Sequence, residues 1–442
     1  MGSTPIDSPS ETPARQALAG CSVTVGPMPF APADLTPLYR EPQYRRLWSL
    51  GMSVGLIRWI EVLAYAVFAY EQTQSALWVA SLMMLRMLPM ALLGLWLGAL
   101  AARLPRRKIL LTVHGAMFGV TLVLLLLSLL GRVEVWHLVV ASGLSGVLWA
   151  CDMPVRRGLM GDIAGPARMA QAMSFDQGAG SVCRLIGPGL GGFVLAGGGL
   201  SGVFVCLSLL YVPALLSLWS LREPSSSGSG QAKKSLREQL GGGFEAARAS
   251  PLLRAALWLT ILFNLFAWPV LSMVPVIAQE RLQLDPQGVG LMVSLEGVGA
   301  LVGALLIGMG AAPWRHGPMF LGAVLSFLAL QLLLAWSPQI WVAGVALLSL
   351  GIAQAGFGIM QSTLVYTAAP PQRRPEAMGL MTMCIGVSPV GFLAVGALAE
   401  RIGAPAATLV FAVCGLLAVA LSWPLCRACV RESARASIQT DR

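Results

Sequence analysis

The stretch LREPSSSGSGQAKKSLREQLGGGFEAARASP, residues 221–251, separates two parts of the chain that share one pattern. Six apolar runs precede it and six follow it. Most are about 20 residues long or longer, enough for a helix to cross a hydrocarbon core of roughly 30 Å. Because a backbone in lipid must satisfy its own hydrogen bonds, each run is predicted to be a transmembrane helix. The expected fold is therefore an all-α membrane protein, with twelve transmembrane helices in two pseudo-symmetric six-helix bundles.

The predicted helices divide the chain into five regions. Residues 1–43, rich in Pro, Ser and Thr, are expected to form a disordered cytoplasmic tail, and residues 429–442 a second cytoplasmic tail. The bundles cover 44–221 and 253–428. The cytoplasmic linker 222–252 is expected to contain a short amphipathic helix around Ser235–Arg248. The spans are placed near 47–70, 76–101, 109–130, 135–155, 170–197, 199–220, 253–279, 287–311, 318–336, 339–366, 376–399 and 404–426.

Lysine and arginine are unevenly distributed between the loops. Of the 30 such residues, three lie within spans, three lie on the side opposite the termini, and the remaining 24 lie on the side of the termini. Basic residues next to a span stay in the cytoplasm, so both termini are expected there, with the chain in a bacterial inner membrane. The net charge of +10 is thus an orientation signal, and we expect no nucleic-acid partner.

Motifs for catalysis or metal binding are not found in the sequence. Cys426 and Cys429 form a single C-x2-C without a second ligand pair, so no metal site is expected. GPGLGG, Gly187–Gly192, matches a dinucleotide pattern but lies inside an apolar span with no strand before it. We therefore expect a protein that is not an enzyme and has no cofactor.

Several local motifs resemble the major facilitator superfamily. GALAARLPRRK (98–108) resembles the family's loop between spans 2 and 3, CDMPVRRGLM (151–160) the end of span 4, and RLIGPGLGG (184–192) the Gly-Pro motif of span 5. Together with YRRLW (44–48), QTQSALWVA (72–80) and LRMLP (85–89), they resemble the twelve-span exporter branch that contains macrolide-efflux and enterobactin-export proteins. This resemblance covers roughly residues 40–430.

The resemblance implies that some of these residues control conformation. In the family, an acidic residue in the loop between spans 2 and 3 latches the two halves in the outward-facing state. Here Ala102 stands at that position. Either the latch is weakened or another acid, Asp152 or Asp162, replaces it; alternatively the loop only fixes orientation. The residues assigned to this group near the loop and span 4 are Gly98, Arg103, Arg106, Arg107, Asp152 and Arg156.

Span 5 carries a stripe of small and charged residues. Asp176, Gly180, Arg184, Gly187 and Gly191 recur every three or four positions, so they lie on one helical face. The family places such a motif, with its Pro188 and Gly192 equivalents, against span 8, where Gly299 and Gly303 are the expected partners. The alternative is ordinary helix packing.

Five charged residues are predicted deep in the membrane: Arg58, Glu61, Arg86, Arg184 and Glu296. A charge there costs roughly 2.5–3.5 kcal/mol, so each needs a partner or water. Arg58 and Glu61 share a face and are expected to pair, and Glu296 is expected either to take up a proton or to meet an Arg of the first half. The excess of arginine favours an anionic substrate, unless Arg86 and Arg184 pair internally.

The substrate and proton pathway is expected to include these five residues and Asp176. Glu61 and Glu296 are the expected proton carriers. Polar residues on the second half are expected to add to the lining, namely Asn264 and Trp268 in span 7 and Gln354 and Gln361 in span 10.

The expected function is proton-coupled export of a drug or a siderophore-like small molecule by alternating access. The proton gradient is the energy source, and the partners are the substrate and the lipid bilayer, with the protein a monomer. The alternatives are uptake of a small anion or metabolite, and a lipid-handling or sensor-like protein with the same fold.

Topology can be tested directly. Single cysteines at Lys233 and Arg442 should react with a thiol reagent from the cytoplasm, and one at Asp285 should react from outside, because basic residues are retained inside. The measurement is labelling of intact and permeabilised cells in a variant without the native cysteines. Labelling of residues 233 and 285 from the same side would overturn the assignment of spans.

Overall fold

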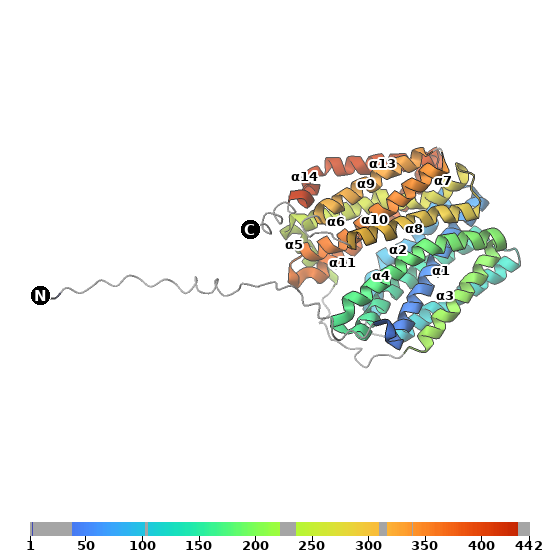
Figure 1. Ribbon diagram of the computed structural model, residues 1–442, viewed down its shortest axis with the longest axis horizontal. Coiled ribbons are helices and arrows are strands. Elements are labelled where there is room, and N and C mark those ends of the chain that lie inside the picture. Colours follow the sequence, from blue (N-terminus) through green and yellow to red (C-terminus); the bar gives the residue numbers. More distant parts are fainter. Residues whose placement is uncertain are drawn as a thin grey trace.

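The computed structural model describes residue 2 and residues 38–101, 105–221, 236–308, 316–337 and 339–431. Every regular element that it describes is a helix (Figure 1). In chain order these are η1 (Leu38–Arg40), α1 (Pro42–Thr73), α2 (Ala76–Ala101), α3 (Arg106–Leu129), α4 (Val135–Trp219), α5 (Leu236–Ala249), α6 (Pro251–Leu262), the π-helical η2 (Phe263–Ala267), η3 (Trp268–Met273), α7 (Val274–Glu280), α8 (Pro286–Gly308), α9 (His316–Trp336), α10 (Ile340–Ala368), η5 (Pro371–Arg373), α11 (Arg374–Ile385), α12 (Ser388–Ile402), α13 (Ala404–Leu421) and α14 (Trp423–Cys426).

Ten helical segments in the described part of the chain are long and apolar enough to cross a membrane. Ala76–Leu92 of α2 is a shorter apolar segment, and Phe175–Trp219 of α4 reverses direction within its length. With these two additions the helices account for all twelve predicted ranges. The prediction of an all-helical membrane protein is confirmed.

Helix α4 contains the span Val135–Ala164 and a second apolar stretch, Phe175–Trp219, which folds back on itself and so makes two spans. Trp48 Nε1 of α1 donates to Phe175 O at 3.4 Å, and the neighbouring Ser49 Oγ lies 2.9 Å from Ser217 Oγ. Residues 175 and 217 would be about 60 Å apart in a straight helix, yet both contact the same turn of α1. The reversal lies at Gly199, whose φ of +58° is accessible to glycine without strain.

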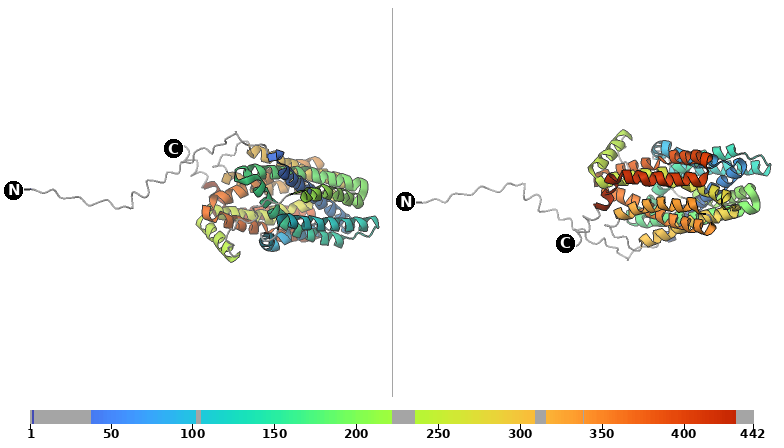
Figure 2. Two further views of the ribbon diagram at one scale, coloured as in Figure 1. Left: turned by 90° about the horizontal axis from the view of Figure 1, so that it is seen from below. Right: turned by 90° about the horizontal axis from the view of Figure 1, so that it is seen from above.

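The helices form two groups, α1–α4 and α6–α13, as the blue-to-green and yellow-to-red ribbons in Figures 1 and 2 show. Each has its own apolar core. In the second, the Phe263 ring stacks on Phe357 with centroids 3.6 Å apart and meets Phe327 edge-on at 4.9 Å. Large apolar side chains such as Leu209 and Leu421 are exposed on the outside, where lipid is the solvent.

The span that begins with α6 is irregular near its middle. A π-helical turn and a 3-10 turn, η2 and η3, interrupt it just before and at Pro269, which lacks a backbone donor. Gln331 Nε2 of α9 donates to Ala267 O at 2.7 Å. This side chain supplies a partner to a carbonyl in the irregular stretch, as a break in the hydrocarbon region requires.

The two bundles approach each other most closely where α4 meets α8. A Cβ added to Gly192 would lie 3.0 Å from Gly290 Cα, and one added to Gly290 would lie 2.5 Å from Pro188 O. Ser294 Oγ of α8 accepts a hydrogen bond from Gly189 N of α4 at 2.9 Å. Span 5 therefore packs on span 8, as the sequence motif predicted.

The partners within this contact differ from those expected. Gly187 and Gly191 face Trp59 and Ile60 of α1, in their own bundle. Because one residue turns a helix by about 100°, positions 188 and 192 face α8 instead. Gly299 and Gly303 face Leu348 and Ile352 of α10, so they pack helices of the second bundle together. The pairing expected between these two glycine pairs is wrong.

The bundles are also joined on the side that carries the turns 73–76 and 280–286, which we call the far side. The opposite side, where α1 begins and α13 ends, is the terminal side. On the far side Ser75 Oγ donates to Glu400 Oε2 at 2.8 Å, and Gln279 Nε2 donates to Glu71 Oε1 at 3.4 Å. The far side is closed in this structure.

The predicted amphipathic helix of the linker is present as α5. It packs on α11 at the terminal side, where Arg373 pairs with Glu245 and a Cβ on Gly243 would lie 2.9 Å from Glu376 O. Other predicted features lie outside the described residues, among them most of both tails, residues 222–235, Ala102 and Arg103. For Gly98 only the helical backbone is described.

Closure of the far side should depend on Gly192. In Gly192→Leu the new side chain would collide with α8, so the bundles could not meet there. Crosslinking between cysteines placed at Ser75 and Glu400 should then fall severalfold. Gly197→Leu, on the same helix with nothing within 4 Å of the added Cβ, is the matched control. Equal crosslinking in both variants would show that closure does not need this contact.

Candidate transport site

A cavity lies between the two bundles near the middle of the helices. It measures about 820 Å³ when the part open to solvent is counted. Its wall is mostly apolar and aromatic, with four charged side chains. The lining comprises Arg58, Trp59, Val62, Leu63, Ala66, Met83, Arg86, Met87, Arg184, Pro188, Trp268, Leu271, Ser272, Val274, Pro275, Val293, Glu296, Leu347 and Phe392.

Glu61 and Arg86 form a buried ion pair inside the first bundle. Arg86 Nη2 lies 2.9 Å from Glu61 Oε2, and the two side chains are only 6% and 1% exposed. Ser145 Oγ of α4 donates to the same carboxylate oxygen at 3.3 Å. These contacts fix α1, α2 and α4 relative to one another, because separating them would leave a buried charge without a partner.

Arg58 does not pair with Glu61, which corrects the expectation from their spacing. Its guanidinium lies over the ring of Trp149, 3.8 Å from the centroid. Arg86 reaches Glu61 from the neighbouring helix and takes the position that Arg58 was expected to occupy. Among the described residues, no carboxylate lies within ion-pair distance of Arg58.

Arg184 and Glu296 connect the bundles across the cavity. Arg184 Nε lies 3.0 Å from Glu296 Oε2, with side chains 15% and 6% exposed. The guanidinium also lies between two rings, 5.1 Å from the centroid of Trp59 and 5.4 Å from that of Trp268. The expectation that Glu296 would take a proton or meet an arginine of the first half is confirmed in its second form.

The internal pairing changes the charge argument. Two of the three deep arginines, Arg86 and Arg184, have carboxylate partners, so they follow the alternative of internal pairs. Arg58 alone of the three keeps its positive charge available in the cavity wall, among the described residues. Any attraction for an anion therefore centres on Arg58.

Of the residues predicted to line the second half, Trp268 lies in the cavity wall, whereas Asn264, Gln354 and Gln361 do not. Asn264 Nδ2 donates to Thr260 O at 2.9 Å, and Gln361 Nε2 donates to Thr260 Oγ1 at 3.0 Å. Gln354 is buried in α10, and its Oε1 has no hydrogen-bond partner among the described residues. The Gln361 bond joins α10 to α6 inside the second bundle.

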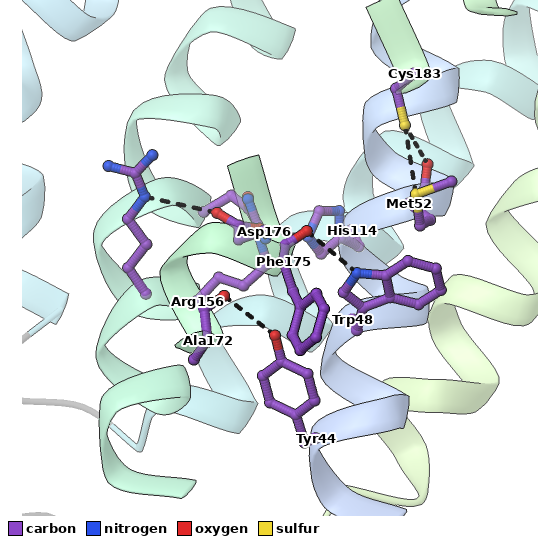
Figure 3. A network of polar contacts seen from close by, with 11 residues as sticks. Tyr44, Trp48, Met52, His114, Arg156, Ala172, Phe175, Asp176 and Cys183 are labelled. Atoms are coloured by element: carbon purple, nitrogen blue, oxygen red, sulfur yellow. Dashed lines mark hydrogen bonds and ion pairs between the residues drawn. The ribbon is translucent and has the colours of Figure 1, made fainter. Parts of the chain in front are cut away.

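A network of charges occupies the first bundle toward the terminal side. Asp152 accepts from His114 Nε2 at 2.9 Å and from Arg156 Nε at 3.2 Å, and Arg156 also pairs with Asp176. Figure 3 shows this group beside the seam between α1 and α4. Tyr44 Oη of α1 closes the seam by donating to Ala172 O at 3.1 Å.

The described part of the basic loop contacts its own bundle. Arg106 pairs with Asp162, and Arg107 Nε donates to Leu218 O at 3.1 Å. Asp162, one of the two acids proposed to replace the missing one, thus pairs within the first bundle. Whether this loop acts as a latch stays a prediction.

Comparison with known proteins identifies the family. Residues 32–440 match the family model of transmembrane secretion effectors, a family of the major facilitator superfamily. The chain belongs to this family. It is therefore a membrane transporter, and its substrate is a small molecule.

Individual relatives are distant. This transporter is 26% identical to the staphyloferrin A transporter of Staphylococcus aureus over 170 residues, 38% of this chain and 43% of that protein, less than half its length. It is 24% identical to the MFS-type transporter YfiS of Bacillus subtilis over 375 residues, 82% of this chain and 87% of that one. A bacterial homologue of Spinster, inward-facing and unoccupied, superposes with a TM-score of 0.66 at 16% identity, covering 89% of this chain and 98% of that one.

Sequence reasoning found one of the three aromatic partners of the charges. Trp268 was expected in the lining and lies there beside Arg184. Trp59 and Trp149 were not assigned to the site, yet each lies beside Arg58. Trp59 could have been found from its position next to Arg58. Trp149 comes from another helix, so no local signal points to it.

The Glu61–Arg86 pair should matter most for stability. Glu61→Gln or Arg86→Gln alone should lower the free energy of unfolding by about 3–5 kcal/mol, since one charge stays buried without a partner. The double variant should recover much of that loss. Glu245→Gln, which breaks an exposed pair, should change it by about 0–1 kcal/mol. Thermal unfolding in detergent measures all four, and equal losses in single and double variants would contradict the argument.

Proposed function

We propose that this transporter exports an amphipathic small molecule that carries a carboxylate, in exchange for protons, by alternating access. The observation that carries the proposal is the cavity wall, where Arg58 stands without an acidic partner among apolar and aromatic side chains. An arginine fork matches a carboxylate in geometry and charge, and the aromatic wall suits the rest of such a molecule.

The cargo we propose is siderophore-like, with a drug of similar size and charge as the alternative. One relative is named as a transporter of staphyloferrin A, and the matching family is described as secretion effectors. Both descriptions support a secreted small molecule. The bacterial relatives also support a location in the bacterial inner membrane. The uneven distribution of lysine and arginine supports an orientation with both termini in the cytoplasm.

Opening of the far side requires the contacts between the bundles to break. These contacts include the Arg184–Glu296 pair in the cavity and the Ser75–Glu400 hydrogen bond at the far side. Rocking of one bundle against the other would separate them and expose the cavity to the outside. On this mechanism the closed far side belongs to the state that loads substrate from the terminal side.

Glu296 is the group we propose to couple this movement to protons. A proton on its carboxylate removes the attraction between Glu296 Oε2 and Arg184. The other carboxylate oxygen, Oε1, has no hydrogen-bond partner among the described residues. A substrate carboxylate that binds Arg58 and Arg184 could replace Glu296 in the same step. Glu61 is less suited to this role, because it is held inside the first bundle by Arg86 and Ser145.

The test is flux in proteoliposomes driven by a pH gradient, with a panel of citrate-type siderophores, their methyl esters and ethidium. The free acids should be transported and the esters should not. Arg58→Gln should weaken binding of the acids by about 10–100-fold, the loss of one charge-assisted hydrogen bond, and Arg58→Lys should recover part of it. Arg254→Gln, which removes an exposed arginine at the start of α6, is the control and should bind normally.

Coupling is tested with the same vesicles. Glu296→Gln should lose gradient-driven flux yet retain substrate binding, because the carboxylate that takes the proton is gone while Arg58 remains. Flux of esters and ethidium equal to that of the acids would contradict the substrate class. Accumulation against the proposed direction would favour uptake of an anion, and activity that depends only on lipid substrates would favour a lipid-handling protein.

A further inference from the structure

A second, smaller cavity lies inside the first bundle. Its polar lining comes from Arg58, Glu61, Arg86, His114, Ser145 and Asp152. Arg58 and Arg86 line both this inner cavity and the cavity between the bundles. The two spaces therefore adjoin at these two arginines, and the proposed function so far uses only the outer one.

His114 and Asp152 form a buried pair at the wall of the inner cavity. They are 4% and 2% exposed, and His114 Nε2 lies 2.9 Å from Asp152 Oδ1. The other carboxylate oxygen, Oδ2, accepts from Arg156. When Nε2 donates to Asp152, Nδ1 is the ring nitrogen that carries the lone pair and can accept a proton.

The pair lies among other charged groups, most of which have partners of their own. The titratable and charged groups that face the inner cavity are Arg58 and Glu61 from α1, Arg86 from α2, and Asp152 and Tyr211 from α4, with Arg156, Arg157 and Asp176 behind Asp152. Four arginines thus surround three carboxylates. A proton on Glu61, Asp152 or Asp176 would take away an arginine's partner. A proton on His114 breaks no pair, and it strengthens the bond to Asp152.

We propose that the His114–Asp152 pair is a proton-binding site of this transporter, reached from the cavity between the bundles past Arg58. The proton comes from water and binds Nδ1, while Nε2 keeps its hydrogen bond to Asp152, so no other bond forms or breaks. The site rests on the proposed proton coupling. The transporter then has two groups that change charge during transport, His114 and Glu296. His114 lies within the first bundle, whereas Glu296 takes part in the pair that joins the bundles.

The geometry links this site to the substrate arginine. Trp149, on which Arg58 lies, precedes Asp152 by three residues on α4, so the ring and the carboxylate share one face of the helix. Arg156, one turn further on, connects Asp152 to Asp176 on span 5 (Figure 3). A change of charge on His114 therefore acts both on the packing of Arg58 and on the contact between spans 4 and 5.

Direct titration tests the site without any substrate. The chain has three histidines, so selective 15N-histidine labelling of the purified protein in nanodiscs gives three sets of signals, assigned with His114→Gln, His137→Gln and His316→Gln. We expect His114 to bind a proton reversibly at Nδ1 as the pH is lowered, and Asp152→Asn to reduce this protonation. His114 signals that do not change with pH overturn the proposal.

Proton release tests its role in transport. A pH-sensitive dye in proteoliposomes reports proton movement when the best-transported siderophore of the panel is added. His114→Gln, whose amide can still donate to Asp152, should lose much of the pH dependence of flux while exchange of labelled for unlabelled siderophore continues. His137→Gln, which changes a half-buried histidine on the far side, should behave as the parent. An unchanged pH profile in His114→Gln would refute the coupling role, whereas a parent without proton movement would refute the proposed function.

Discussion

A charge inside a membrane protein must find a partner or reach water, and most of the architecture described above follows from this constraint. Glu61 and Arg86 satisfy it within one bundle, and their mutual burial joins α1 to α2. Arg184 and Glu296 satisfy it only when the bundles meet, so their pair is complete in one arrangement of the molecule. Arg58 satisfies it by lying on Trp149 at the edge of a cavity.

This difference separates rigid parts from parts that can move. The first bundle is tied together by buried pairs with partners on the same side of the interface, so it can rotate as a unit. The contact between α4 and α8 is instead made of glycines and backbone, as at Gly192 and Gly290. Such a surface has few interlocking side chains. When the two helices separate, they lose close packing but leave no charge exposed to lipid at this contact. The charged pair across the cavity is then the contact whose breaking costs most, and a proton or an anion can offset that cost.

Much of the fold and part of the site could be predicted from the chain alone. The all-helical membrane fold, the linker helix and the packing of span 5 on span 8 were predicted and confirmed. All five deep charges were found by their position in apolar runs. Their partners were less predictable: i, i+3 spacing suggested Arg58 and Glu61, but Arg86 on another helix was closer to the carboxylate. Helical spacing was also a poor guide to which polar residues line the cavity. Gln354 and Gln361 share a face of α10, yet neither lines the cavity, and Asn264 does not line it either.

The sequence by itself determined that the chain is a membrane protein of two six-helix parts, because hydrophobic length and the cost of unpaired backbone in lipid are local properties. It also determined which residues carry charge into the membrane. Only the tertiary structure decided which charges meet, which face of span 5 touches α8, and that His114 lies against Asp152 beside the same inner cavity as Glu61. Helix periodicity fixes the face a residue shares with its own neighbours. The rotation of each helix about its axis, and so the residue it meets on another helix, depends on the packing of all of them together.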